Sequence, residues 1–518
     1  MNAVWKWVES GHLPGIRSVL RCLLILLLAG ACCTKVAASE FEWPDGKISK
    51  VYQEFLAAYN TNNEEQLIRF VKKYHKSRNT QKIAHYWLRV YTEYGRLVPF
   101  SIEASQTDES RLGLWLQGKH TKSWAMIVFR MDPGLNKIVR KGLRRGDRPN
   151  IAVPPFVPVK AKQIASHLQS YLEELEARDH FSGAVLVARG GKVLFKGAYG
   201  YRDKEHRQKN AIDTSFKIAS VTKSFTGVAL AHLVQSEKLQ FSDTLDKFIP
   251  EYPKDISRQV SVHHLLTHTS GLEFDDHPAF NTAMINANSV EELLKAQITY
   301  MDHMNEGRRS NFKVLNKYDY SNENYALVAV IIERVSGMSY AEYLEKNISI
   351  PLDLQNTFAD YLKLSKHKNK AVGYTYRDLD GNYRLDKRRP NTDLLWKFAN
   401  PAGGVYSSVE DLYRYFHAVI EGKLVNASMR DMLLGHHTTA FSDPKNNTYK
   451  YYGYGFHEKV NGELRVIGHS GSYPGVGARF QYYSGHDIYV IVLSNYGSIA
   501  SGHVAGYVNN LIEPRAFR

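Results

Sequence analysis

Four prolines, Pro149, Pro154, Pro155 and Pro158, lie within one short segment and divide the chain. Proline fixes the backbone angle φ and donates no backbone hydrogen bond, so neither a regular helix nor a central strand can run through this segment. We therefore predict a stiff linker at 149–162, between a small domain at 41–148 and a large domain at 163–518. With 518 residues, 43% of them hydrophobic and 23% charged, the chain can form more than one core and is not typical of disorder.

The segment 1–38 has the pattern of a signal peptide. Basic residues precede an apolar run from Cys22 to Cys32, which is too short to cross a bilayer comfortably, and Val36-Ala37-Ala38 supplies small residues at a cleavage point. We expect cleavage there and export to the periplasm or out of the cell. An uncleaved membrane anchor and a lipoprotein signal at Cys32 are the alternatives.

All three cysteines lie in this leading segment, at Cys22, Cys32 and Cys33. The predicted mature chain therefore has no cysteine, which excludes disulfides, thiol catalysis and zinc–thiolate sites. The formal charge of +15 fits an anionic polymer or surface as partner, or serves solubility alone. We expect a small-molecule or peptide substrate, peptidoglycan-derived fragments included, and no nucleic acid.

The small domain begins with helices and continues with strands. Apolar residues recur at helical spacing from Ile48 to Tyr59, a second helix follows Asn62-Asn63, and a third runs from about Gln81 to Tyr94. The predicted strands are Leu97–Ala104, Arg111–Gln117 and Trp124–Met131. This order favours an α+β unit with a curved sheet around helices and resembles the NTF2-like cone. The basic residues from Arg140 to Arg148 are interpreted as a solvated face.

The two ends of the large domain carry its strand signals. The predicted strands are Gly183–Ala188, Val193–Ala198, Leu464–Gly468, Ala478–Tyr483 and Ile488–Leu493, with a Gly190-Gly191 turn in the first hairpin. Helices are predicted from Ile164 to Ala177 and from Ser501 to Ile512. We predict an α+β fold in which these five strands form one antiparallel sheet, with the two terminal helices on one face. The residues between are predicted to be mostly helical and to pack on the other face.

A nucleophile motif opens an apolar helix at Ser220-Val221-Thr222-Lys223. A serine and a lysine three residues apart lie on one helix face, and a lysine of depressed pKa can take the serine proton. The same spacing recurs at Ser310, Ser365 and Ser442 without an apolar helix behind it. Alone, Ser220 also fits a helix N-cap beside a solvated lysine.

Two further motifs carry side chains suited to acyl transfer. Tyr320-Ser321-Asn322 opens another apolar helix, so a tyrosine oxygen and an amide are available beside the serine. His469-Ser470-Gly471, followed by Ser472, ends an apolar strand whose N–H groups can face a substrate carbonyl. Taken singly, the tyrosine fits packing and the strand end fits a glycine-rich turn.

The three motifs in this order resemble those of the serine β-lactamase and penicillin-binding-protein superfamily, in the branch with a tyrosine in the second motif. That branch holds class C β-lactamases, D-alanyl-D-alanine carboxypeptidases, D-aminopeptidases and family VIII esterases. The resemblance covers about 163–518 and includes Phe181–Val187, His264–Leu272 and Pro401–Gly404.

The resemblance implies a role for each motif residue. Ser220 would form the acyl-enzyme, and Lys223 and Tyr320 would share the proton chemistry, in an order that the sequence leaves open. Asn322 and the strand His469, Ser470, Gly471 and Ser472 would position the substrate, with the N–H groups of Ser220 and Ser472 as oxyanion hole. We expect the lysine charge to lower the pKa of Tyr320.

Two observations refine the predicted activity. Efficient β-lactamases of this branch usually carry lysine at the position of His469, and a mostly neutral histidine favours a peptidase or esterase. A β-lactamase and a non-catalytic peptidoglycan-binding protein that uses the same cleft are the alternatives.

His264 and His268 have the spacing of zinc ligands but lack the intervening glutamate, so we expect no metal and no cofactor.

Overall fold

The computed structural model describes residues 41–77, 79–104, 110–146, 161–272, 278–303, 312–378, 383, 387–395, 398 and 400–512. The predicted signal segment and most of the predicted linker lie outside these residues. No helix among the described residues is long and apolar enough to cross a membrane.

Residues 41–146 form an N-terminal unit with its own core. Its elements are α3 (Lys47–Tyr59), α4 (Glu64–Tyr74), α5 (Thr80–Tyr94), β1 (Leu97–Ala104), β2 (Arg111–Gly118), β3 (Trp124–Met131) and β4 (Ile138–Gly146). Asn63 caps α4 by accepting the N–H of Gln66, and Gly95, with φ 64°, follows the last residue of α5. The four strands form an antiparallel sheet in chain order, packed on the helices. The three helices and first three strands confirm the prediction, whereas β4 was missed because its arginines and lysine alternate with few apolar residues.

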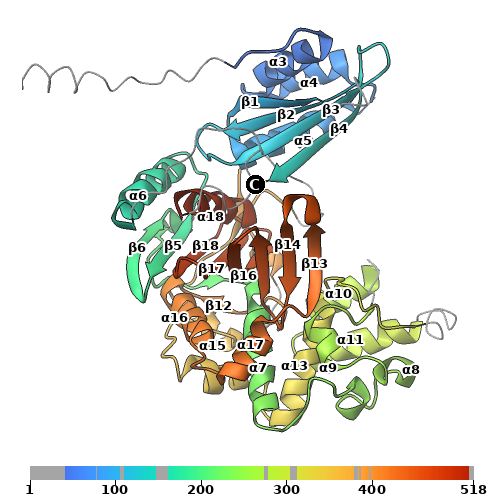
Figure 1. Ribbon diagram of the computed structural model, residues 1–518, viewed down its shortest axis with the longest axis vertical. Helices are drawn as coiled ribbons and strands as arrows, with labels where there is room; N and C mark the ends of the chain where they lie inside the picture. Colours follow the sequence, from blue (N-terminus) through green and yellow to red (C-terminus); the bar gives the residue numbers. More distant parts are fainter. Residues whose placement is uncertain are drawn as a thin grey trace, which may run out of the picture.

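The rest of the described chain is built on one eight-stranded antiparallel sheet, in the order β13-β14-β15-β16-β17-β18-β5-β6 (Figure 1). The strands are β5 (Gly183–Arg189), β6 (Lys192–Tyr199), β13 (Thr438–Asp443), β14 (Thr448–Tyr452), β15 (His457–Asn461), β16 (Leu464–Tyr473), β17 (Val476–Tyr483) and β18 (Ile488–Ser494). The predicted pairing of the two chain ends is confirmed, with β18 beside β5. The prediction that the residues between were mostly helical was wrong for β13, β14 and β15. These strands contain few aliphatic residues, so no apolar strand period stands out in their sequence.

The two faces of this sheet bury different cores. Terminal helices α6 (Ala161–Ala177) and α18 (Ser498–Ile512) pack on one face, where Val490 and Val492 meet Leu168 and Leu511. The other face packs against the helical layer through Phe480, Ile491 and Leu493. Because successive strand residues point to opposite faces, one strand contributes to both cores.

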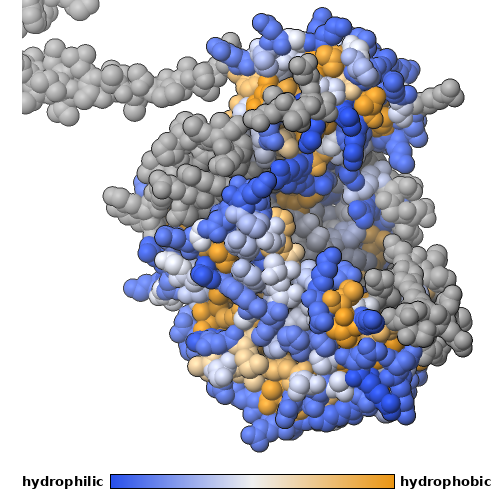
Figure 2. Space-filling model, turned by 45° about the vertical axis from the view of Figure 1, so that its right-hand side comes forward, coloured by the Kyte–Doolittle hydropathy of each residue, from blue (hydrophilic) through white to orange (hydrophobic). Residues whose placement is uncertain are grey.

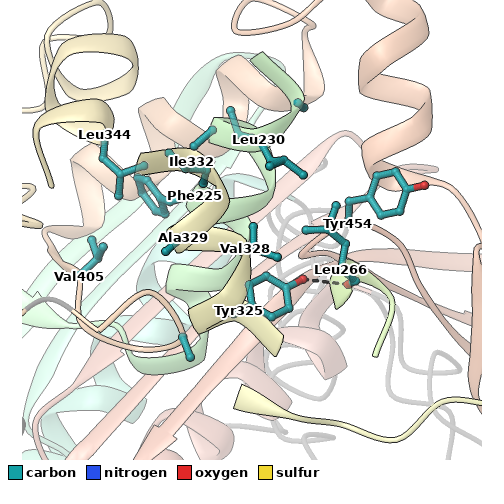
Figure 3. Close-up of a cluster of buried hydrophobic side chains, with 14 of the residues drawn as sticks. Phe225, Leu230, Leu266, Tyr325, Val328, Ala329, Ile332, Leu344, Val405 and Tyr454 are labelled. Atoms are coloured by element: carbon teal, nitrogen blue, oxygen red, sulfur yellow. Dashed lines mark hydrogen bonds between the residues drawn. The ribbon is translucent and has the colours of Figure 1, made fainter. Parts of the chain in front are cut away.

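The helical layer centres on α7 (Thr222–Gln235) and α13 (Asn322–Ser336), which lie side by side (Figure 3). Phe225 and Leu230 of α7 approach Val328 and Ile332 of α13, and the Tyr325 hydroxyl donates to the Leu266 carbonyl at 3.0 Å. The remaining helices are α8 (Lys254–Ser257), α9 (Val262–Leu266), α10 (Pro278–Asn286), α11 (Val290–His303), α14 (Tyr340–Leu344), α15 (Tyr361–Lys366), α16 (Val409–Ile420) and α17 (Ala427–Leu434). Short strands are β7 (Tyr201–Asp203), β8 (Gln208–Lys209), β9 (Phe216–Lys217), β10 (Tyr374–Thr375), β11 (Arg389–Pro390) and β12 (Tyr406–Ser407).

The N-terminal unit rests on α6 and α18 (Figure 1). The Tyr171 hydroxyl of α6 donates to the Thr121 carbonyl at 2.6 Å. His503 of α18 has its Nε2 2.6 Å from the Glu93 carbonyl and its Nδ1 hydrogen-bonded to the Ser123 hydroxyl. Buried polar contacts of this kind require complementary positions on both sides, so they fix how the unit sits on the sheet.

Candidate active site

Ser220 lies at the junction of a short 3-10 turn, η1 (Ala219–Val221), and helix α7. The preceding residue, Ala219, has φ 45°, a left-handed conformation that costs energy for a residue other than glycine. Strand β16 packs closely against this turn. A Cβ atom at Gly471 would lie only 2.0 Å from the Ile218 carbonyl oxygen. Only glycine permits this approach, so the strand and the serine are held in direct contact.

Lys223 lies one turn further along α7 and is fully buried. Its Nζ is 2.7 Å from Asn322 Oδ1, 2.9 Å from the Ala402 carbonyl and 3.4 Å from Ser220 Oγ. Burial lowers the pKa of Lys223 to about 7, with the charge of Glu323 as a weaker opposing effect. Near neutral pH, a large fraction of this amine is therefore unprotonated.

Tyr320 stands just before α13 and reaches toward the same lysine. Lys223 Nζ lies 4.8 Å from the centre of the Tyr320 ring. Desolvation raises the pKa of Tyr320 to about 12, and hydrogen bonding with Ser220 partly offsets the rise. The expectation that the lysine charge lowers the pKa of Tyr320 was therefore wrong, because desolvation outweighs the effects that lower this pKa.

His268 holds the loop that carries Tyr320. Its Nδ1 accepts the backbone N–H of Ser321 at 3.1 Å, its carbonyl accepts the N–H of Asp319 at 2.7 Å, and its ring lies 4.4 Å from the Tyr320 ring. Burial keeps the pKa of His268 well below its usual range. The sequence drew attention to this residue as a metal-ligand candidate and as part of the segment His264–Leu272 in the family resemblance, and neither observation revealed its structural role.

His264, the other member of that candidate pair, is engaged elsewhere. Its Nδ1 lies 3.1 Å from the Ser261 N–H, and Ser261 in turn caps α9. Within the described residues, no group of three or more histidine, cysteine, aspartate or glutamate side chains could hold a metal ion.

His469 on β16 is buried and points toward a tyrosine of β14. Its Nδ1 lies 2.9 Å from the Ser470 carbonyl and therefore carries the proton, while Nε2 accepts the Tyr452 hydroxyl at 3.0 Å. Burial, with the charges of Lys223 and Lys450, lowers the pKa of His469 to about 3. His469 therefore stays neutral at physiological pH.

The end of β16 offers an unpaired edge beside the serine. Strand β15 pairs with β16 only as far as Gly468, whereas β17 pairs with it as far as Tyr473. The stretch from His469 to Tyr473 therefore has no strand on the β15 side among the described residues. Ser470 and Ser472 are exposed, and Gly471 faces the serine turn. Such an edge can hydrogen-bond an extended substrate.

The structure brings Ser220, Lys223, Tyr320, Asn322 and the end of β16 to one place. Two contributors were not predicted individually, the Ala402 carbonyl and Tyr452. Ala402 lies in the segment Pro401–Gly404, whose resemblance was visible without its contact to Lys223. Tyr452 belongs to a strand that was not predicted, so no sequence signal marked it.

Comparison with known proteins places this architecture. The family model described as Beta-lactamase matches residues 168–510. Penicillin-binding protein 4* of Bacillus subtilis is 30% identical over 336 residues, 64% of this chain and 71% of that protein. The octameric penicillin-binding protein homologue from Pyrococcus abyssi has 28% identity and a TM-score of 0.58, over 68% of this chain and 77% of that one. D-amino acid amidase from Ochrobactrum anthropi SV3 shares the fold, with 22% identity and a TM-score of 0.55 over 68% of this chain and 99% of that one.

The fold and these relatives define a serine hydrolase of the penicillin-recognising type. The chain belongs to the beta-lactamase family.

Proposed function

We propose that the protein is an exported hydrolase that cleaves D-amino-acid amide, D-peptide or ester bonds through an acyl-enzyme on Ser220. The observation that carries this proposal is the surroundings of Lys223, a fully buried amine 3.4 Å from Ser220 Oγ. A lysine without solvent or a carboxylate partner costs folding energy when charged, and such cost is typical of catalytic sites.

Lys223 acts as the base for acylation. A neutral amine has two N–H groups and one lone pair, and the oxygens of Asn322 and Ala402 accept both N–H groups. The lone pair is left for the Ser220 hydroxyl. As the proton moves to Nζ, Oγ bonds to the substrate carbonyl carbon and a tetrahedral oxyanion forms.

The free edge of β16 supports the substrate during this step. The N–H groups of Ser220 and Ser472 would stabilise the oxyanion, and the stretch His469, Ser470 and Gly471 would hold the chain of the substrate by its backbone. The close contact of Gly471 with the serine turn keeps these donors in a fixed relation to Oγ.

Tyr320 acts as the acid for the leaving group. Its raised pKa keeps the phenol protonated, so it can give its proton to the departing amine or alkoxide as the tetrahedral intermediate collapses. The phenolate that remains sits beside the Lys223 ammonium and takes a proton from the water that attacks the acyl-enzyme. Lys223 then returns its proton to Ser220 Oγ, which restores the starting state.

One finding favours amide or ester substrates over β-lactams. The neutral His469 places no cation on the strand that would face a substrate carboxylate.

A substrate panel tests this function: D- and L-alanine p-nitroanilides, p-nitrophenyl acetate and a chromogenic cephalosporin. We expect the D-amide and the ester to be hydrolysed by the wild type and not by Ser220→Ala. Fastest turnover of the cephalosporin would instead indicate a β-lactamase. Rates equal to those of Ser220→Ala on every substrate would indicate a non-catalytic peptidoglycan-binding protein and contradict the proposal.

Export depends on the segment 1–38, whose basic start, apolar run and small residues support a cleavable signal. Sequencing the N-terminus of the protein recovered from the native cell tests this part. Ser39 is the expected first residue, and retention of Met1 would contradict cleavage.

A further inference from the structure

A cavity of about 630 Å³ lies where the N-terminal unit meets the end of strand β16. Ser472 and Tyr473 of β16 line it from one side, and Arg89 of α5 and Arg145 of β4 line it from the other. Figure 2 shows the surface hollowed between these two parts of the molecule. The cavity therefore adjoins the open edge of β16, and one of its walls comes from a unit outside the family match at 168–510.

The open edge of β16 has a leaving-group end and an acyl end. At one end, the Tyr452 hydroxyl donates to His469 Nε2 at 3.0 Å, and the Tyr452 ring lies 4.9 Å from the His268 ring. The His268 ring in turn lies 4.4 Å from that of Tyr320, the acid of the proposed mechanism. The leaving group of a bound substrate would therefore lie at the His469 end. The acyl part would run along the strand in the other direction, toward the cavity.

Two arginines from different parts of the chain face one aromatic ring of the cavity. The guanidinium carbon of Arg89 lies 4.8 Å from the centre of the Tyr383 ring, and that of Arg377 lies 5.1 Å from it. Arg377 Nε also donates to the Tyr383 hydroxyl at 3.0 Å. A guanidinium packed on a ring keeps in-plane N–H groups for other acceptors, and their fork matches a carboxylate.

Positive charge exceeds negative charge in the cavity even after every ion pair is counted. Glu93 is the one carboxylate among the described lining residues. Its oxygens lie 2.6 Å from Arg145 Nη2 and 3.9 Å from Arg89 Nε. With Arg377, three arginines share this carboxylate, which leaves two positive charges in excess. A fourth arginine, Arg388, adds nothing to the excess, since it pairs with Asp179 behind the wall.

The histidines of the lining do not add charge. Burial lowers the pKa values of His180 and His503 to about 4, so both rings are neutral at physiological pH. The charge available to a ligand is therefore that of the arginines alone.

Tyrosines held by their hydroxyl groups form the rest of the wall. Tyr473 donates to the Leu394 carbonyl at 2.8 Å, and Tyr496 donates to Asp179 at 2.5 Å. Both rings are half-buried and line the cavity, so they offer apolar surface to the spacer that precedes a charged group.

We propose that this cavity is an acyl-side subsite that takes a carboxylate carried by the substrate, held by Arg377 together with Arg89 and Arg145. The direction of the substrate rests on the proposed function. The N-terminal unit thereby contributes to the specificity of the large domain, because two of the three arginines belong to it.

A matched pair of substrates tests the subsite: N-succinyl-D-alanine p-nitroanilide and its neutral isostere, N-succinamoyl-D-alanine p-nitroanilide. We expect kcat/KM to be at least about tenfold higher for the succinyl compound, with a difference that shrinks as salt is added. Arg377→Gln and Arg145→Gln should each reduce this preference to about threefold or less. Both should hydrolyse p-nitrophenyl acetate as the wild type does, because acetate does not reach the cavity.

Arg465→Gln is the control, since Arg465 lies on β16 but does not line this cavity. Titration calorimetry of both compounds with Ser220→Ala separates the subsite from catalysis. Tighter binding of the succinyl compound, lost in Ser220→Ala with Arg377→Gln, would support the subsite even without turnover. Equal affinity for the two compounds, including no binding of either, or an equal loss of preference in Arg465→Gln, would overturn the inference.

Discussion

Lys223 combines full burial with three oxygen neighbours and no salt bridge to a described carboxylate. In water its amine would be charged at every physiological pH, and here its pKa falls to about 7. At this pKa the Lys223 amine can accept a proton at neutral pH, which an exposed lysine cannot do. Tyr320 is shifted in the opposite direction, so the pair contains one proton acceptor and one proton donor at neutral pH.

The first prediction concerns the acid side of the activity profile. Because Lys223 must be neutral to accept the Ser220 proton, kcat/KM on a neutral ester should fall tenfold per pH unit below about 7. The raised pKa of Tyr320 keeps its phenol protonated across the same range. The measurement is kcat/KM between about pH 5 and 9, and a rate that stays constant down to pH 5 would contradict the role of Lys223.

The second prediction concerns His469. Its pKa of about 3 means that it does not titrate between pH 5 and 8, so it should add no acid limb of its own. His469→Gln should therefore change the height of the profile without moving its midpoint. Comparison of the two kcat/KM profiles checks this, and a midpoint that moves in the variant would show that His469 titrates with activity.

Strand β16 connects the chemistry to the fold. Gly471 lets the strand lie against the serine turn, and the early end of β15 leaves its edge open at the same level. The strained Ala219 sits between these two features. In the proposed mechanism, substrate binding, oxyanion stabilisation and the position of Ser220 would therefore all depend on one contact between β16 and η1.

The third prediction tests that contact. Gly471→Ala places a methyl group where only 2.0 Å separates it from the Ile218 carbonyl, so the strand must move away from Ser220. A displacement of this kind should lower kcat/KM by about a hundredfold. Gly485→Ala is the control, since no atom lies within 4 Å of a Cβ there. Unchanged kcat/KM in Gly471→Ala would show that the contact is not needed.

Sequence patterns predicted the elements whose residues alternate or repeat clearly. Gly190 and Gly191 both have positive φ, as the tight turn between β5 and β6 requires, and the hairpin was found from them. By contrast, β14 was missed because Lys450 faces a polar cavity, so its polarity breaks the apolar alternation. The three motifs predicted residues that the structure brings together, but the Ala402 carbonyl and the ring of His268 join them through tertiary contacts that spacing alone does not encode.

At the scale of the whole molecule, His503 joins the two parts. Its Nδ1 accepts a hydrogen bond from the Ser123 hydroxyl, and its Nε2–H donates one to the Glu93 carbonyl. This arrangement requires the neutral imidazole ring. Burial lowers the pKa of His503 to about 4. The contact is thus stable at neutral pH and weakens in acid.

The fourth prediction follows from that shift. His503 binds a proton below about pH 6.5 in the unfolded chain, but only below about pH 4 in the folded chain. The free energy of unfolding therefore decreases as the pH is lowered through this window, by up to about 3 kcal/mol. His503→Gln should remove this part of the pH dependence of the urea midpoint, and exposed His167→Gln should retain it. Identical pH dependence in the wild type and His503→Gln would refute the assignment.

The central claim is that Ser220 becomes acylated with Lys223 as its base. Peptide mass spectrometry after brief exposure to benzylpenicillin and an acid quench measures this directly. The account predicts an adduct of the intact penicillin on the peptide that contains Ser220, no adduct in Ser220→Ala, and slower formation in Lys223→Met. An adduct of equal yield in Ser220→Ala, or one on a different residue of the wild type, would contradict it.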